Sequence, residues 1–199
     1  MRFRLLTGLA FLAACLALSG EVLAQGYDYS MYDNDPEEIR SGGAPRGRMR
    51  GYSPVPRTTV SFSDKYKAGD IVINTGERRL YYVLGDGQAL RYGIGVGRIG
   101  FTWSGVKTVT AKKEWPGWTP PPQMLKRQPH LPRYMKGGED NPLGARAMYL
   151  GSTLYRIHGS NEPETIGQAV SSGCFRLTNE DVKDLYERVQ VGATVHVMR

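Results

Sequence analysis

The sequence predicts a mostly β domain that carries one helix near its C-terminal end. Short runs of β-branched and aromatic residues recur between glycine-containing turns, which is typical of antiparallel strands and hairpins. Among the 199 residues are 25 glycines and 12 prolines, and these residues favour turns and short strands over long helices. One stretch near the C-terminus instead has its apolar residues at helical spacing.

Two segments precede this domain. Residues 1–24 combine a basic start, an apolar run and the small residue Ala24 at their end, so they are predicted to be a secretory signal peptide. The run Leu12-Ala13-Ala14-Cys15 also resembles a bacterial lipobox, and lipid anchoring at Cys15 is the alternative. Residues 25–57 sustain no apolar period, and we expect a disordered linker there.

The domain itself is predicted over residues 58–199, and its strands follow from β-rich runs. Each run is bounded by glycines or polar turn residues, so neighbouring runs are expected to pair as a meander and a later hairpin. The expected strands are residues 71–74, 80–84, 89–96, 148–150, 154–158 and 194–198.

Residues 115–144 interrupt the strands with a segment rich in proline, glycine and aromatic side chains. Proline lacks an N–H donor and fixes φ, so no regular structure is expected from Trp115 to Pro122. A long irregular segment inside a compact domain usually serves function, and we expect it to form a lid or cleft wall.

The one helix is expected after Thr178, which is a good N-cap residue. Glu180 and Asp181 place negative charge in the first turn, where the helix dipole favours it. The apolar residues that follow repeat at i, i+3, i+4 and i+7, so one face should pack on the sheet. They are Val182, Leu185, Tyr186 and Val189.

A histidine and a cysteine carry the strongest chemical signal. His158 is expected at the end of a strand, and Cys174 follows sixteen residues later, before another strand. Two neighbouring strand ends bring imidazole and thiol within reach, and an adjacent imidazole lowers the pKa of a thiol. Gly173 permits a tight turn whose amide groups would face an oxyanion. The alternative is a buried structural thiol.

The residues around this pair resemble a known family. His158-Gly159-Ser160-Asn161 and Ser171-Ser172-Gly173-Cys174-Phe175-Arg176-Leu177 resemble the signature of the L,D-transpeptidase catalytic domain, the YkuD family. Further stretches look like its periplasmic Gram-negative branch: residues 118–121, 141–145, 166–167 and 178–182. Many members have histidine where Ser172 stands here, which leaves His158 to serve alone as base.

The resemblance implies a β-sandwich or barrel-like fold and acyl transfer from a peptidoglycan stem peptide. Cys174 would attack the diaminopimelate carbonyl of a tetrapeptide, His158 would protonate the leaving D-Ala, and the Gly159 carbonyl would orient the imidazole. Arg176 is the candidate for holding a substrate carboxylate, with a structural ion pair as its alternative. The other candidate substrate-binding residues are Ser171, Ser172, Gly173, Asn161, Tyr149 and Trp118.

The acceptor stays open at this point. It is the amine of a second stem, giving a 3–3 cross-link, an amine on an outer-membrane protein or lipoprotein, a free D-amino acid, or water in a carboxypeptidase or endopeptidase. Sortases separate histidine and cysteine by far more than sixteen residues, and papain-like peptidases place cysteine first. A non-catalytic peptidoglycan-binding module is the remaining alternative.

Other functions have little support in the sequence. His130 lies in a proline-rich loop, and His196 alternates with valines and should face away from the core. Cysteine and histidine lack zinc spacing, and no glycine-rich phosphate loop opens a helix, so neither metal nor cofactor is expected. The net charge of +7 suits an anionic partner such as wall peptides. No nucleic-acid module is recognisable, and a periplasmic location is expected.

Overall fold

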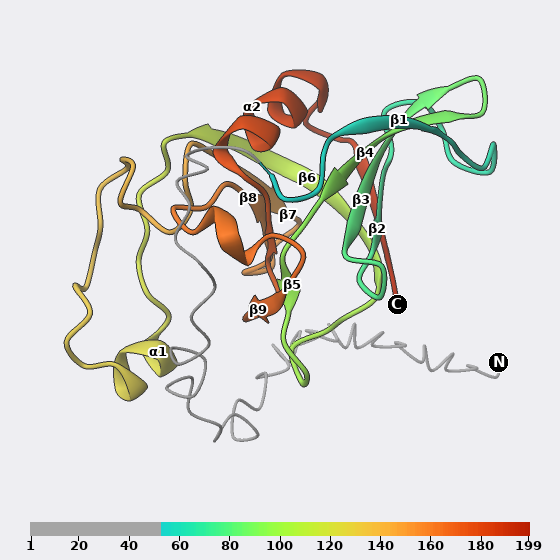
Figure 1. Ribbon diagram of the computed structural model, residues 1–199. Helices are drawn as coiled ribbons and strands as arrows, with labels where there is room; N and C mark the ends of the chain where they lie inside the picture. The colour runs from blue at the N-terminus through green and yellow to red at the C-terminus, as the bar shows by residue number, and fades with distance from the viewer. Residues whose placement is uncertain (1–52) are drawn as a thin grey trace, which may run out of the picture.

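The computed structural model describes residues 53–199, so the predicted signal peptide and most of the predicted linker lie outside the described residues. A nine-stranded sheet has the order β1-β4-β3-β2-β11-β6-β7-β8-β10, and β5 pairs with β9 in a second sheet (Figure 1). The strands are β1 Thr58–Ser61, β2 Ile71–Asn74, β3 Arg79–Gly85, β4 Gln88–Gly93, β5 Val96–Gly97, β6 Gly105–Glu114, β7 Arg146–Leu150, β8 Arg156–His158, β9 Ala169–Ser171, β10 Phe175–Arg176 and β11 Thr194–Met198.

Helices are few, as the sequence predicts. The α-helices are α1 Pro122–Arg127 and α2 Asn179–Arg188, and a 3-10 turn covers Pro163–Thr165. No helix within residues 53–199 has the length and apolar character needed to cross a membrane.

The large sheet is mixed. Strands β2, β3 and β4 form the expected antiparallel meander, and β7 and β8 form the expected hairpin. The closing strand β11 lies between β2, to which it is parallel, and β6, to which it is antiparallel. Strand β10 is parallel to β8, which requires a long connection between the two because parallel neighbours cannot be joined by a tight turn.

The strand expected over residues 89–96 is split into β4 and β5 at Gly95. Here the chain leaves β3 and pairs with β10 instead: Gly95 and Arg176 exchange two backbone hydrogen bonds of 2.9 Å. The extension of β4 thus meets the far edge of the nine-stranded sheet. This contact closes the sheet on itself, which is the barrel-like form that the family resemblance implies.

Helix α2 covers one side of this structure, over β7 (Figure 1). Its N-cap is Thr178, as predicted, and the Thr178 Oγ1 accepts a hydrogen bond from Asp181 N at 3.1 Å. Val182 and Leu185 are fully buried on the face that points to the sheet. Burial of each such side chain contributes about 1.5–3 kcal/mol, so packing holds the helix in place.

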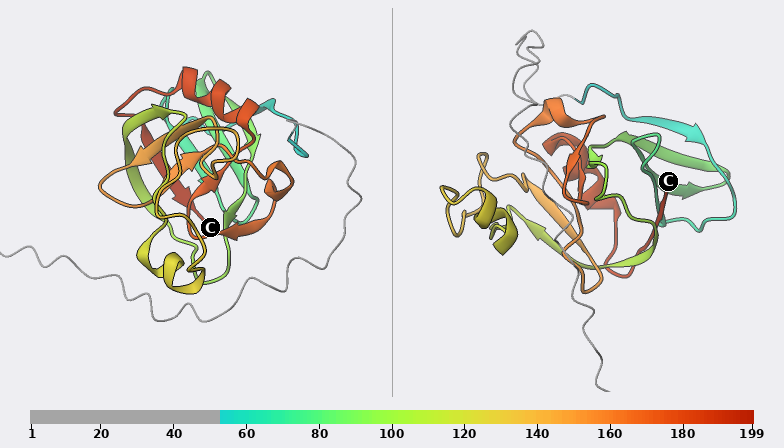
Figure 2. Two further views of the ribbon diagram at one scale, coloured as in Figure 1. Left: turned by 90° about the vertical axis from the view of Figure 1, so that its left-hand side faces the viewer. Right: turned by 90° about the horizontal axis from the view of Figure 1, so that it is seen from below.

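Two elements differ from the sequence-based expectation. Strand β6 was not predicted because its residues are mostly polar, with Val109 alone fully buried; backbone pairing to β7 and β11 forms it. Helix α1 begins at Pro122, inside the segment expected to be irregular, since proline is tolerated at the first helical position. The segment 115–144 projects from one side of the domain (Figure 2).

Contacts with the domain extend back to the end of the predicted linker. Val55 packs against Gly93, and Arg57 forms ion pairs of 3.5 and 3.4 Å with Asp181 and Asp184 of α2.

Gly144 supports the loop that leads into β7, and its replacement tests that packing. Its φ is 61°, and a Cβ there would press into Asn179 Oδ1 and lie 2.6 Å from Ser160 N. We expect Gly144→Ala to lower the free energy of unfolding by roughly 3 kcal/mol. Gly192→Ala is the control, since its φ is 99° but nothing lies within 4 Å; it should cost about 1 kcal/mol. Urea denaturation measures both, and equal losses would contradict the packing role.

Candidate active site

The parallel pairing of β8 and β10 brings the predicted nucleophile and base to one place. Ile157 lies opposite Phe175, and His158 lies opposite Arg176. The His158 carbonyl accepts a 2.8 Å hydrogen bond from Leu177 N, which fixes this register. Cys174 immediately precedes β10, so the same register places it opposite Arg156, diagonally across from His158 on the same face of the strand pair.

The imidazole of His158 is held in one tautomer. Its Nδ1 lies 2.6 Å from the carbonyl oxygen of Gly159, and a carbonyl only accepts, so Nδ1 carries the hydrogen. The neutral ring therefore leaves Nε2 with a lone pair that can take a proton. His158 is 4% exposed, and burial and then the nearby Arg176 lower its pKa to about 3, against a smaller opposing effect of the Gly159 hydrogen bond.

The thiol of Cys174 is half-buried and protonated in this environment. Its Sγ donates a hydrogen bond of 3.6 Å to the Leu154 carbonyl. Burial raises the pKa of Cys174, and the guanidinium groups of Arg156 and Arg176 oppose this rise. The causes of this shift include the two arginines and not His158, so the lowering of the thiol pKa by the imidazole stays a prediction. The resting pair is a neutral thiol and a neutral imidazole.

The loop that carries Cys174 is braced from both sides. Ser171 Oγ donates to the Cys174 carbonyl at 2.6 Å and accepts from Gly173 N at 3.2 Å. The Trp103 indole donates to the Gly173 carbonyl at 2.9 Å and stacks on Tyr155, with ring centroids 4.6 Å apart. The Gly173 amide is thus already used within the loop, and an oxyanion contact from the other amides of this turn stays a prediction.

Glycine is required at position 173 by its surroundings. Its φ is 99°, and a Cβ would lie 2.7 Å from the Tyr155 ring. The motif glycine therefore allows the loop to pass close to Tyr155 while it turns toward β10.

The predicted substrate-binding residues differ in their positions. Arg176 forms a 3.0 Å ion pair with Glu162, which is the structural alternative considered for it. Ser171 is buried with its hydroxyl engaged inside the loop, a position that favours shaping the loop, whereas Ser172 is exposed. Asn161 is exposed, and its amide donates to the Asp140 carbonyl at 3.1 Å, which links the catalytic loop to the segment 115–144.

The two aromatic candidates lie on different elements. Tyr149 is on β7, and the Arg156 guanidinium lies over its ring at 5.3 Å from the centroid. Trp118 lies in the segment 115–144, where its backbone pairs with that of Met135. The roles of both in binding substrate remain predictions.

Three residues of this site were missed by the sequence reasoning: Trp103, Leu154 and Arg156. Trp103 is distant along the chain and contributes through its indole N–H, so no motif marks it. Leu154 contributes only a backbone carbonyl, which no sequence pattern can reveal. Arg156 is two residues before His158, and the side chains of a strand two apart share a face; that spacing was the available signal.

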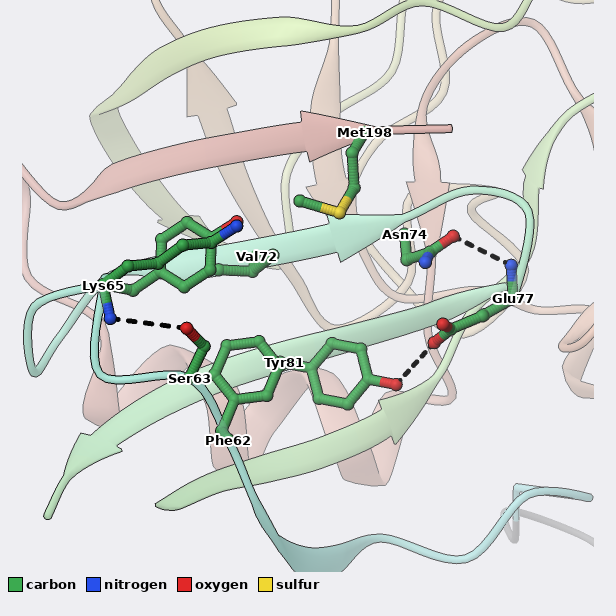
Figure 3. Close-up of a pocket in the computed structure, with 9 residues that line it drawn as sticks. Phe62, Ser63, Lys65, Val72, Asn74, Glu77, Tyr81 and Met198 are labelled. Carbon is green, nitrogen blue, oxygen red and sulfur yellow. Dashed lines mark hydrogen bonds between the residues drawn. The ribbon is translucent and has the colours of Figure 1, made fainter. Parts of the chain in front are cut away.

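A hollow of about 220 Å³ lies elsewhere, on the face of β2 and β3 (Figure 3). Aromatic rings form part of its wall, with Phe62 and Tyr81 stacked at 4.8 Å. None of the predicted catalytic or substrate-binding residues lines it, so cavity size does not locate the chemistry here. Its lining consists of Phe62, Ser63, Lys65, Tyr66, Val72, Asn74, Glu77, Tyr81 and Met198.

His196 lies outside this site. It is on β11 and faces Asp70 at 3.3 Å, while its neighbours Val195 and Val197 are buried, as their alternation predicted. Within residues 53–199, no three histidine, cysteine, aspartate or glutamate side chains gather in an arrangement suited to a metal ion.

A profile of the YkuD family, the L,D-transpeptidase catalytic domain, matches residues 68–197. The chain belongs to this family. The probable L,D-transpeptidase ErfK/SrfK of Escherichia coli is 42% identical over 137 residues, which are 64% of this chain and 43% of that protein. The probable L,D-transpeptidase YbiS of the same organism is 43% identical over 135 residues, 63% of this chain and 43% of that one. The chain thus matches less than half the length of these relatives.

Solved structures support the L,D-transpeptidase fold. An L,D-transpeptidase from Mycobacterium tuberculosis superimposes with a TM-score of 0.52 at 18% identity, covering 66% of this chain and 58% of that one, which shows the fold alone. A Brucella melitensis structure described as a probable carnitine operon oxidoreductase is 47% identical, with a TM-score of 0.51 over 71% of this chain and 92% of that one.

The Brucella structure is named as an oxidoreductase, but the glycine-rich stretch of this domain does not have the arrangement of a nucleotide-binding loop. Gly93 ends β4, Gly95 bridges to β10, Gly97 ends β5, and Gly100 lies in the loop before β6. A nucleotide-phosphate loop instead joins a strand to the N-terminus of a helix.

The buried neutral His158 makes the stability of the domain depend on pH. Its pKa is about 3 in the folded chain and 6.5 in the absence of these surroundings. Between these values the unfolded chain binds the extra proton, so stability falls as the pH falls from 6.5 toward 3, by roughly 1.4 kcal/mol per pH unit. Urea denaturation from about pH 7 to about pH 4 should show a larger loss for wild type than for His158→Asn. Parallel pH curves for the two proteins would contradict the burial of a neutral ring.

Proposed function

We propose that this domain catalyses L,D-transpeptidation of peptidoglycan stem peptides, with Cys174 as nucleophile and His158 as proton carrier. The observation that carries the proposal is the pairing of β8 with β10, which places the half-buried Cys174 diagonally across the two strands from the tautomerically fixed His158. Membership of the L,D-transpeptidase family supplies the substrate class.

Acylation proceeds by exchange of one bond for another. Cys174 Sγ attacks the diaminopimelate carbonyl of a tetrapeptide, the Sγ–C bond forms, and the thiol proton passes to His158 Nε2. The C–N bond to D-Ala then breaks, and Nε2 returns the proton to the leaving amine. Because both groups start neutral, proton removal must accompany the attack instead of preceding it.

Deacylation reverses the same proton path. An amine attacks the thioester carbonyl, His158 Nε2 accepts the proton that the amine loses, and the Sγ–C bond breaks to release the thiolate. Nε2 then returns the proton to sulfur. The acceptor amine belongs to a second stem in the leading form of the proposal, with an outer-membrane protein or lipoprotein, a free D-amino acid, or water as the alternative acceptors.

Arg176 and the candidates Ser172, Asn161, Tyr149 and Trp118 are proposed to contact the donor peptide. Asn161 is exposed just before the 3-10 turn and Ser172 just after β9, where an incoming peptide would meet them. The bond between Asn161 and Asp140 supports a role for the segment 115–144 as a wall of the cleft.

An extracytoplasmic location fits this substrate. Residues 1–24 are proposed to direct export to the periplasm, with lipid anchoring at Cys15 as the alternative, and residues 25–57 to serve as a linker before the catalytic domain over residues 58–199. The Escherichia coli relatives named above come from a Gram-negative organism, which agrees with this assignment.

Mass spectrometry of products tests the function. Wild-type protein incubated with disaccharide-tetrapeptide should release D-Ala and form a 3–3 dimer. Cys174→Ala should abolish both products, and its cooperative denaturation should show that it is still folded. His158→Asn should lower turnover by roughly 10²–10⁴-fold. The matched control is His196→Asn on β11, which should retain wild-type turnover.

The other outcomes discriminate between the alternatives. Tripeptide without dimer would assign hydrolysis, or a protein acceptor if added outer-membrane protein is then acylated. Wild-type turnover by Cys174→Ala would refute the proposed mechanism. Unchanged tetrapeptide, with no adduct on Cys174, would favour a binding module.

A further inference from the structure

A thiolate at Cys174 needs a positive charge near it, and His158 does not supply one. A nucleophilic cysteine is commonly stabilised by an adjacent imidazolium. Here the imidazole is buried with its Nδ1–H fixed on the Gly159 carbonyl, and Arg176 lies directly across the strand pair from it. A second positive charge on the ring would be both desolvated and repelled.

The position of the sulfur points to a different cation. Sγ lies 3.6 Å from the Leu154 carbonyl oxygen, and the Arg156 Nη1 lies 3.1 Å from the same oxygen. The shared acceptor keeps the two donors on the same side of the strand pair, where the register of β8 and β10 also places Cys174 opposite Arg156.

The guanidinium of Arg156 is held in this position by its surroundings. It lies over the Tyr149 ring at 5.3 Å from the centroid, and its Nε is buried without a hydrogen-bond partner among the described residues. The tyrosine face and the Leu154 carbonyl therefore fix the guanidinium next to the sulfur before any substrate arrives.

The charge of Arg156 is also uncompensated in the described part of the chain. No carboxylate within residues 53–199 forms an ion pair with it, whereas Arg176, the other cation near the sulfur, is paired with Glu162 at 3.0 Å. Burial raises the pKa of the Cys174 thiol, and Arg156 does most to lower it.

We propose that Arg156 is the counter-ion of the Cys174 thiolate, in the place that an imidazolium occupies in other cysteine enzymes. When the S–H bond breaks, the electron pair stays on sulfur beside the guanidinium. The proton goes to solvent in the free enzyme and to His158 Nε2 during acylation. The inference rests on the proposed role of Cys174 as nucleophile, and it separates two tasks: Arg156 stabilises the charge and His158 carries the proton.

The rate of Cys174 alkylation by iodoacetamide, measured against pH, tests this assignment without any substrate. Removing the charge in Arg156→Gln should raise the pH midpoint of alkylation and slow the reaction at neutral pH by about tenfold, since each unit of thiol pKa changes the thiolate fraction tenfold. Arg156→Lys keeps the charge and should restore most of the rate. His158→Asn should stay within about threefold of wild type, because a neutral ring is removed.

Arg146→Gln is the matched control. Arg146 is on β7, its guanidinium lies over Tyr186 at 5.2 Å, its Nε is likewise buried without a partner in the described chain, and it pairs with Glu114 at 3.0 Å. It resembles Arg156 in its ring contact and its buried Nε, but it has a carboxylate partner and lies away from the sulfur, so its variant should alkylate like wild type. Thermal unfolding of each variant verifies folding.

Two outcomes would overturn the proposal. One is an unchanged midpoint in a folded Arg156→Gln protein. The other is a rise in the midpoint of one unit or more in His158→Asn, which would identify imidazolium as the counter-ion even if Arg156→Gln failed to fold. Neither outcome bears on whether Cys174 is acylated by a tetrapeptide, so the proposed function is tested separately by its products.

Discussion

The parallel pairing of β8 with β10 is the constraint on which the site depends. Two short strands hydrogen-bond in a register that sets His158 opposite Arg176, and the hydrogen bond from Leu177 N to the His158 carbonyl continues it. Since parallel neighbours need a long connection, the residues between them must leave the sheet and return. This connecting segment contains the 3-10 turn, β9 and the Cys174 loop, and it is held in place by the pairing of β5 with β9.

The closure of the sheet at Gly95 adds a second effect. It pairs the β10 edge, which would otherwise be open, through the two hydrogen bonds between Gly95 and Arg176. Burial then favours the uncharged forms, which are the neutral imidazole and the protonated thiol, because charged groups lose hydration in a desolvated position. In the proposed mechanism charge develops only when the reaction begins, and Arg156 is the group proposed to stabilise it on sulfur.

The sequence predicted those elements whose signal is local. The meander, the β7–β8 hairpin, the capped helix α2 and the closing strand all have an apolar period or turn residues of their own, and the structure has each of them. Strand β6 was not predicted because its residues are mostly polar and are held by neighbours distant in sequence. The split of β4 from β5 depends on a partner, β10, about eighty residues away.

The site follows the same rule. His158 and Cys174 could be singled out because side-chain chemistry and spacing mark them. The Leu154 carbonyl and the Trp103 indole depend on how strands are brought together, and no spacing within the motif encodes them. The position of Arg156, two residues before His158 on the same strand, was the one local signal for the rest of the site. Burial of the ring, which opposes a charge on His158, likewise depends on the packed strands and not on the motif.

The central claim is that His158 is neutral in the resting enzyme, with its hydrogen on Nδ1. A ¹⁵N NMR titration of the imidazole in the wild-type protein tests it directly, with His158→Asn used to assign the signal. The account predicts a protonated Nδ1 and an unprotonated Nε2 that persist from neutral pH down to about pH 4. Two protonated nitrogens at neutral pH would show an imidazolium and would contradict the account.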